Sequence, residues 1–335
     1  RIKLTNNDSN YDLLSYIKLD NNEISTKIIS LGKSFLVILA EQKRNCHLKI
    51  FQKIDNEEKN NISKNKNNNE SEQNNTLENS FNSNLNNCED VPPIGNCGLF
   101  INKDIGEDVS FKQLFKNINE DKKILISIYP IEKKLINSDE DNNINNDDED
   151  DNYLYEFIAT SNRVYFTGKD KVEFYGIKKN EKGEYYVKKI KEINGISCST
   201  EADSICQISD KYLCIGLKSH NFKGQKSGFA IIDIYKREKH SIIRDQEISC
   251  IYFNPINNLL FASMEVRSTK KYYFASKIYL VNKDEDDIKL ENIYKYKNEQ
   301  NDVITSIQQI NSYMENEEEN KIMFVTSSND STLEI

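Results

Sequence analysis

Short stretches in which apolar residues alternate with polar ones recur along most of this chain. Each repeat has an alternating segment, a polar turn, a second apolar segment that ends in small residues, a polar hairpin and a third alternating segment. A period of two over short segments predicts β-strands. Five repeats are recognised, with strands predicted at 28–31, 35–40 and 48–51; at 155–159, 164–168 and 172–175; at 204–208, 212–216 and 230–234; at 248–253, 259–263 and 278–281; and at 303–307, 322–327 and 332–335.

The spacing of these repeats predicts a β-propeller. The second strands of the last four repeats begin near Val164, Leu213, Leu260 and Met323. A period of about 40 to 50 residues with four short strands is typical of a propeller blade. A single four-stranded sheet leaves two apolar faces in water, whereas sheets stacked around an axis cover one another. Outer strands are expected to be more polar, and the candidates lie at 185–187, 240–243 and 290–294.

Two low-complexity tracts interrupt this pattern. Residues 56–90 are dominated by Asn with Glu, Ser and Lys, and residues 137–152 by Asp and Asn. Neither tract can bury enough apolar surface to offset the entropy of ordering it, so both are predicted to be disordered inserts. They also account for a mean hydropathy of −0.71 in a chain with 18 Tyr and 15 Phe.

Residues 91–135 do not fit the repeat. Phe111, Leu114, Phe115 and Ile118 have helical spacing, which predicts a short amphipathic helix at 110–119, and a strand is predicted at 124–129. The segment is interpreted as a degenerate blade or as a helix-containing insert that packs on a neighbour, and the helix could serve as a lid or a partner-binding element.

The predicted domain is one propeller over residues 1–335. Residues 13–17 could supply an outer strand that closes the ring, which gives an expected total of about six to seven four-stranded antiparallel blades. The chain starts without Met and stops within an apolar-alternating run, so we expect a piece of a longer protein, cut at both ends.

Two segments resemble the WD40-repeat-like propeller superfamily. Ile231 to Lys236 is similar to the end of that family's third strand, with Tyr235 where the repeat usually has Trp. The segment 326–335 resembles the family's hairpin between second and third strands, in which an Asp, here Asp330, holds the turn through its side-chain acceptor. The chain has no Gly-His and no Trp-Asp pair. The resemblance implies an all-β WD40-like propeller, and the Asn-rich inserts are similar to those of proteins from AT-rich protozoan genomes.

Charge and hydropathy limit the kinds of partner, and the cysteines indicate the compartment. The net charge is −9, but residues 139–151 hold eight acids and no base, so the rest of the chain is nearly neutral. No basic stripe suited to nucleic acid and no apolar run long enough for a membrane span occurs. Seven Cys, several inside apolar segments, favour a reducing compartment, so we expect a cytoplasmic protein.

The sequence shows no catalytic or cofactor motif. His47, His220 and His240 stand apart from recognisable nucleophiles and acids, and no Cys pair has the spacing of a zinc site. No glycine-rich phosphate loop is present. We therefore expect no enzyme activity, no metal and no small-molecule cofactor.

Two long hairpins in consecutive repeats carry basic and aromatic residues, the usual carriers of binding energy at interfaces. Consecutive blades would place these hairpins side by side as one rim patch, which predicts a protein–protein interaction scaffold. The alternative is the propeller portion of a vesicle-coat or tether subunit or of a ubiquitin-ligase adaptor, and a third reading is a propeller hydrolase with carboxylates at the pore. The predicted binding residues are Lys218, His220, Phe222, Arg267, Lys270, Lys271 and Tyr272.

Overall fold

The computed structural model describes about three fifths of the chain, and the secondary structure there is entirely β. The described residues are 15–17, 24–42, 45–54, 97–99, 110–117, 125–133, 153–161, 170–199, 203–218, 227–267, 272–284, 287–311 and 322–334. Within these ranges no helix is long and apolar enough to cross a membrane. The predicted inserts at 56–90 and 137–152 lie outside them. The chain divides into two compact units, residues 1–118 and 119–335.

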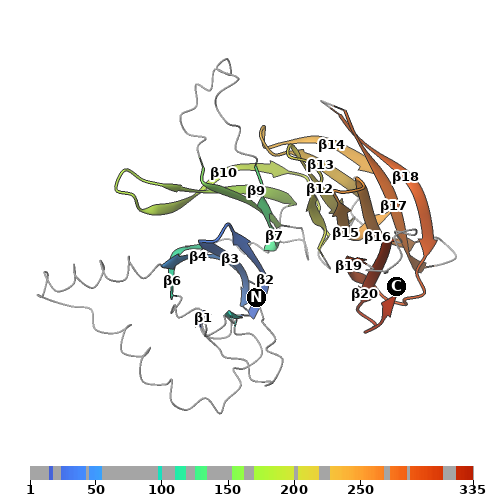
Figure 1. The fold of residues 1–335 in the computed structure, drawn as a ribbon, viewed down its shortest axis with the longest axis horizontal. Helices are drawn as coiled ribbons and strands as arrows, with labels where there is room; N and C mark the ends of the chain where they lie inside the picture. Colours follow the sequence, from blue (N-terminus) through green and yellow to red (C-terminus); the bar gives the residue numbers. More distant parts are fainter. Residues whose placement is uncertain are drawn as a thin grey trace, which may run out of the picture. The chain divides into compact units, whose positions relative to one another are not determined.

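The first unit holds one four-stranded antiparallel sheet, here called blade 1 (Figure 1). Its core contains Ile38, Ala40 and Phe51, with Leu36 packed against them. A separate short pair joins β1 (Ser15–Ile17) to β5 (Cys97–Leu99), so the prediction that 13–17 forms an outer blade strand is wrong. The strands of blade 1 are, in spatial order, β2 (Ile24–Leu31), β3 (Phe35–Gln42), β4 (Asn45–Ile54) and β6 (Ser110–Asn117).

The helix predicted at 110–119 is wrong, because Ser110–Asn117 is strand β6, the outer strand of blade 1. The register of β6 on β4 shifts by one residue between Ile50 and Phe51. Such a bulge interrupts the period of two. The apolar spacing that remains is close to the helical period, which explains the wrong assignment.

The second unit contains four further antiparallel sheets, blades 2 to 5, each built from strands that follow one another along the chain (Figure 1). Blade 2 has β7 (Leu125–Ile131), β8 (Tyr155–Ser161), β9 (Lys171–Lys179) and β10 (Tyr185–Asn194); blade 3 has β11 (Ile205–Gln207), β12 (Tyr212–Leu217), β13 (Gly228–Asp233) and β14 (Glu238–Arg244); blade 4 has β15 (Glu247–Asn254), β16 (Leu259–Arg267), β17 (Tyr272–Asp284) and β18 (Asp287–Lys297); blade 5 has β19 (Ile304–Asn311), β20 (Ile322–Ser328) and β21 (Leu333–Glu334).

Most predicted strands of blades 1, 3, 4 and 5 are confirmed, and so are the outer strands predicted near 185, 240 and 290. In blade 2 the predicted third strand, 172–175, is confirmed as part of β9, whereas the strand predicted as the first is the second. Residues 155–159 belong to its second strand, because Leu125–Ile131 pairs with them as the first. The predicted strand 164–168 lies outside the described residues. The segment 91–135 is therefore not a blade or insert of its own, since it supplies β5, β6 and β7 to different sheets.

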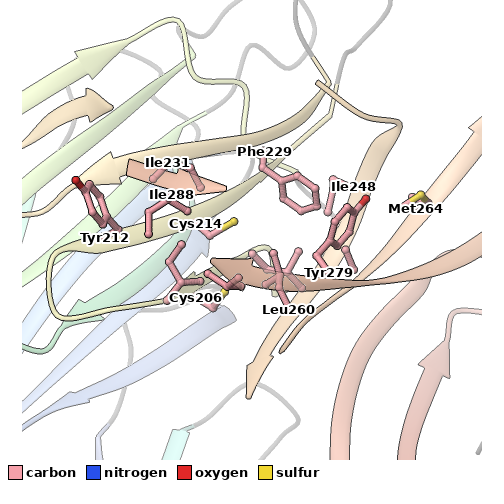
Figure 2. Packing of buried hydrophobic residues seen from close by; sticks show 14 of the residues in the cluster. Cys206, Tyr212, Cys214, Phe229, Ile231, Ile248, Leu260, Met264, Tyr279 and Ile288 are labelled. Carbon is pink, nitrogen blue, oxygen red and sulfur yellow. The ribbon is translucent and has the colours of Figure 1, made fainter. Parts of the chain in front are cut away.

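Blades of the second unit cover one another, which explains why their strands are apolar on both faces. In β13, Phe229 and Ile231 enter a core shared with blade 4, and Ala230 and Ile232 enter a core shared with blade 2. Figure 2 shows the first of these cores, which contains Tyr212 and Cys214 of blade 3 together with Leu260 and Met264 of blade 4. This face-to-face stacking is the blade arrangement of a propeller.

The described residues thus form five blade-like sheets, four of four strands and one of three. The expected total of six to seven blades is wrong for the part of the chain that the structure describes. Two of the predicted additional blades came from 13–17 and from 91–135, and both segments pair elsewhere.

Candidate functional site

One end of the second unit carries the connections of several blades, and we call it the turn face. It comprises residues 129–133, 153–154, 207–211, 233–237, 253–258 and 283–284, which belong to the β7–β8, β11–β12, β13–β14, β15–β16 and β17–β18 connections. Side chains hold two of these turns rigidly. The Asp233 carboxylate accepts hydrogen bonds from the backbone N–H groups of Tyr235 and Lys236, both at 2.9 Å. The Asn254 side chain accepts one from Ile256 N–H at 2.9 Å.

Each of these two turns ends in a residue with positive φ, Arg237 at 52° and Asn258 at 53°. An Asx side chain at the start and a left-handed residue at the end fix the turn backbone in one conformation. These two turns are therefore rigid, and they can bind a partner without a large ordering cost.

A hollow of about 530 Å³ opens on the turn face between blades 2, 3 and 4. Its walls combine aromatic rings and prolines with charged groups of both signs, which is the composition of a binding pocket with a few polar groups that orient the ligand. The hollow is lined by Tyr129, Pro130, Glu132, Lys133, Gln207, Ile208, Ser209, Asp210, Phe253, Pro255 and Lys283.

Gln207 joins blades 2 and 3 at the edge of this hollow. Its side-chain amide accepts from the Glu132 N–H at 3.0 Å and donates to the Glu132 carbonyl at 2.7 Å. Its backbone N–H donates to the Tyr129 hydroxyl at 3.0 Å. Burial raises the pKa of Tyr129 to about 12, although the bond from Gln207 opposes this shift, so the hydroxyl stays protonated at neutral pH.

The buried carboxylate of Glu156 links blades 2 and 3 on the turn face. It accepts from Arg237 of blade 3, with Nη2 at 3.1 Å from Oε1, and it forms an ion pair with Lys133 of blade 2. Lys133 Nζ also lies 5.4 Å from the centre of the Tyr235 ring. The contacts hold Tyr235, at the tip of its turn, against the neighbouring blade.

Large apolar side chains of the turn face are exposed to water. Ile256, at the tip of the β15–β16 turn, is 85% exposed, Leu154 is 53% exposed and Tyr235 is 38% exposed. Lys283 Nζ lies over the Phe253 ring, 5.1 Å from the ring centre. Burial lowers the pKa of Lys283, and the nearby Asp210 charge opposes that shift. Exposed apolar groups on the same face as a mixed-charge hollow are typical of a protein-binding surface.

The rim patch predicted from the sequence lies at the opposite end of the blades, and the structure describes only part of it. The β12–β13 and β16–β17 connections lie at the same end of the adjacent blades 3 and 4. Lys218 Nζ of blade 3 lies 2.6 Å from Glu265 Oε1 of blade 4. Lys218 is only 5% exposed, so it does not lie on an exposed surface as expected, whereas Tyr272 is 56% exposed. His220, Phe222, Lys270, Lys271 and the side chain of Arg267 lie outside the described residues.

Asp330 lies in the turn between β20 and β21, as its sequence context suggested. Its carboxylate accepts from Thr332 N–H at 3.0 Å and from Asn301 N–H at 2.7 Å. Hydrogen bonds from Thr332 and Asn301 lower the pKa of Asp330 to about 2. It therefore ties its turn to the loop before β19.

Sequence reasoning missed the turn face because the hollow is assembled from turns far apart in the chain. One local signal was present: Asn254-Pro255-Ile256-Asn257-Asn258 places a large apolar residue in a turn between two strands. An isoleucine there contributes to neither sheet face, so an interaction role would have been a reasonable hypothesis. Within the described ranges no group of His, Cys, Asp and Glu is arranged to hold a metal ion.

The fold and the turn face define an all-β protein with a propeller-like arrangement of antiparallel blades. No family model matches the chain, and no curated protein is significantly similar to it.

Proposed function

We propose that this chain is a non-catalytic scaffold for protein–protein interaction, a cytoplasmic WD40-like propeller that docks partner proteins on its turns and rim. One observation carries the proposal: the hollow opens on the same turn face that leaves Ile256, Tyr235 and Leu154 exposed to water. Propellers commonly bind proteins in this way, although fold alone does not determine function. The Asp330 turn supports the WD40-like subclass.

The cytoplasmic location is supported by the cysteines. Cys198, Cys206, Cys214 and Cys250 are buried and carry free thiols. Free buried thiols are usual in reducing compartments, where disulfides are rare. Cell fractionation tests this location directly: a tagged full-length chain should be recovered in the cytoplasmic fraction.

The docking surface is tested by affinity capture with the full chain and matched variants. Ile256→Glu places a charge at the tip of the turn face, and Ile293→Glu places one at an equally apolar but distant site on β18, where Ile293 is 51% exposed. We expect Ile256→Glu to weaken binding of a captured partner by about thirtyfold, as for loss of an interface hot spot, and Ile293→Glu to leave it unchanged.

A third variant, charge-reversed at Arg267, Lys270 and Lys271, tests the rim patch. If the partners depend on these residues and not on Ile256, docking occurs at the rim and the turn face is not the site. If all three variants retain every partner, the scaffold proposal is wrong for both surfaces.

A further inference from the structure

Glu132 is held in a fixed position in the lining of the hollow. The Gln207 side chain binds both of its backbone groups, accepting from the N–H at 3.0 Å and donating to the carbonyl at 2.7 Å. Glu132 itself is exposed. Besides burial, which is the largest cause, the Glu132 charge raises the pKa of Tyr129, so its field acts on another lining residue. The hollow therefore presents a positioned carboxylate to a ligand.

The other charged groups of the lining have charges of opposite sign close by. Lys133 forms an ion pair with the buried Glu156 carboxylate. Lys283 of blade 4 is attracted by the Asp210 charge of blade 3. Within the described residues no base forms an ion pair with the Glu132 carboxylate. A ligand with a positive charge can therefore neutralise Glu132 without displacing a partner in the described part of the chain.

Apolar groups form the wall opposite Glu132. Blade 3 shares one core with blade 2 and another with blade 4, so it lies between them. Glu132 belongs to the blade 2 side of the hollow, and Phe253 and Pro255 belong to the blade 4 side. Phe253 is half-buried and Pro255 is exposed. A ligand that spans the hollow of about 530 Å³ meets an acid on one side and an apolar surface on the other.

The connection between β7 and β8 adds negative charge to the turn face. Its described ends, Lys133 and Tyr153, both belong to that face, and eight acids and no base occur between residues 139 and 151. Such charge attracts basic partners at long range and raises their association rate. Contacts within the hollow determine mainly the dissociation rate. The two contributions can therefore be separated by kinetics.

Resting on the proposed docking role of the turn face, we propose that the hollow binds an extended segment of a partner protein that carries a basic and an apolar residue. The basic side chain pairs with Glu132, and the apolar side chain packs on Phe253 and Pro255. Nucleic acid does not fit this site, because Glu132 and the acidic connection repel phosphate groups.

The test uses the purified full chain and a fluorescent synthetic peptide in which leucine, serine and arginine repeat. We expect the peptide to bind, and Glu132→Lys to weaken binding by about tenfold or more. The matched control is Glu299→Lys, at an exposed acid in the β18–β19 connection at the opposite end of the blades. It should change binding by less than about twofold. Circular dichroism verifies that both variants remain folded.

The apolar wall has its own control peptide, in which serine replaces leucine while the charge stays. We expect it to bind about tenfold more weakly, because it buries no apolar side chain in the hollow. Equal binding of the two peptides, or equal losses in the two variants, would overturn the proposal, since either result shows attraction by charge alone.

A further variant replaces the eight acids of residues 139–151 by their amides. We expect the association rate of the peptide to fall by about tenfold at low ionic strength and the dissociation rate to stay the same. If the dissociation rate rises as much as in Glu132→Lys, the connection holds the peptide and the proposal is wrong. If the peptide does not bind while partner capture still depends on Ile256, this proposal is wrong and the scaffold proposal stands.

Discussion

Single residues set the distance between blades, and Gly216 is the clearest case. A Cβ atom on Gly216 of blade 3 would lie 2.6 Å from Cγ2 and 3.1 Å from Cβ of Ile248 in blade 4. Real Cβ atoms do not approach other atoms so closely, so the first strand of blade 4 can pack here only against a glycine. At an unstrained open position, glycine to alanine stabilises a protein, because the unfolded chain loses freedom. At Gly216 the overpacking cost exceeds that gain.

We expect Gly216→Ala to lower the free energy of unfolding by about 1 to 3 kcal/mol, measured by urea denaturation. In an Ile248→Ala background the same substitution should cost much less, because the contacting Cγ2 atom is gone. Strictly additive effects of the two substitutions would show that the contact does not limit packing.

At the scale of elements, a carboxylate fastens the connection between blades 3 and 4. Asp245, between β14 and β15, accepts from Lys277 Nζ and from the Tyr279 hydroxyl of β17, both at 2.5 Å. Burial alone would raise the pKa of Asp245, but the hydrogen bonds from Lys277, Tyr279 and the Gln246 N–H hold that pKa below its usual value. A carboxyl group whose pKa is lowered by folding stabilises the folded state above the unfolded pKa.

We expect Asp245→Asn to reduce the free energy of unfolding by about 2 kcal/mol at neutral pH. The difference from the unmodified chain should shrink as the pH falls below about 4, since the carboxylate then becomes protonated. Chemical denaturation across a pH series measures both. The control is Asp284→Asn, whose side chain is 71% exposed, and it should change stability little at any pH. A pH-independent effect of Asp245→Asn would contradict the electrostatic explanation.

How well each element could be predicted depends on what lies between its strands. The strands of blades 3 and 4 were evident because both faces are buried and their residues follow one another closely, as in Phe229 to Ile232. β7 and its partner β8 are separated by residues 132–154, so the pairing was not visible in a local pattern. β6 could not be recognised as a strand, because it lies far from β4 in the sequence and because its bulge interrupts the period of two. The hollow was not predictable, because Tyr129, Gln207 and Phe253 meet only after three blades have stacked.

At the scale of the whole molecule, each apolar cluster formed by the described residues of the second unit draws on more than one blade. The cluster around Leu260 contains Cys214, Phe229 and Ile231 from blade 3 as well as Met264 and Tyr279 from blade 4 (Figure 2). The Lys218–Glu265 ion pair crosses the same joint. Blades 3 and 4 therefore share one apolar cluster. Loss of contacts in one of these blades should destabilise the other.

We expect Leu260→Ala to cost about 2 to 5 kcal/mol and to increase hydrogen exchange in β12 and β13 as well as in β15 to β17. Exchange in blade 1 serves as the internal reference. Faster exchange confined to blade 4 would show that the blades open independently and would contradict the shared-core interpretation.

The positions of the two low-complexity tracts have an evolutionary consequence. Residues 56–90 interrupt the chain between β4 and β6, and residues 137–152 interrupt it between β7 and β8, so both tracts join strands that pair with each other. Doubling the length of such a connection costs only about 0.6 kcal/mol, because closure entropy grows with the logarithm of length. Insertions can therefore accumulate in these tracts over generations with little effect on folding. Substitutions at contacts between blades, such as that of Gly216 with Ile248, are selected against. Related chains should differ widely in length while keeping the same joints.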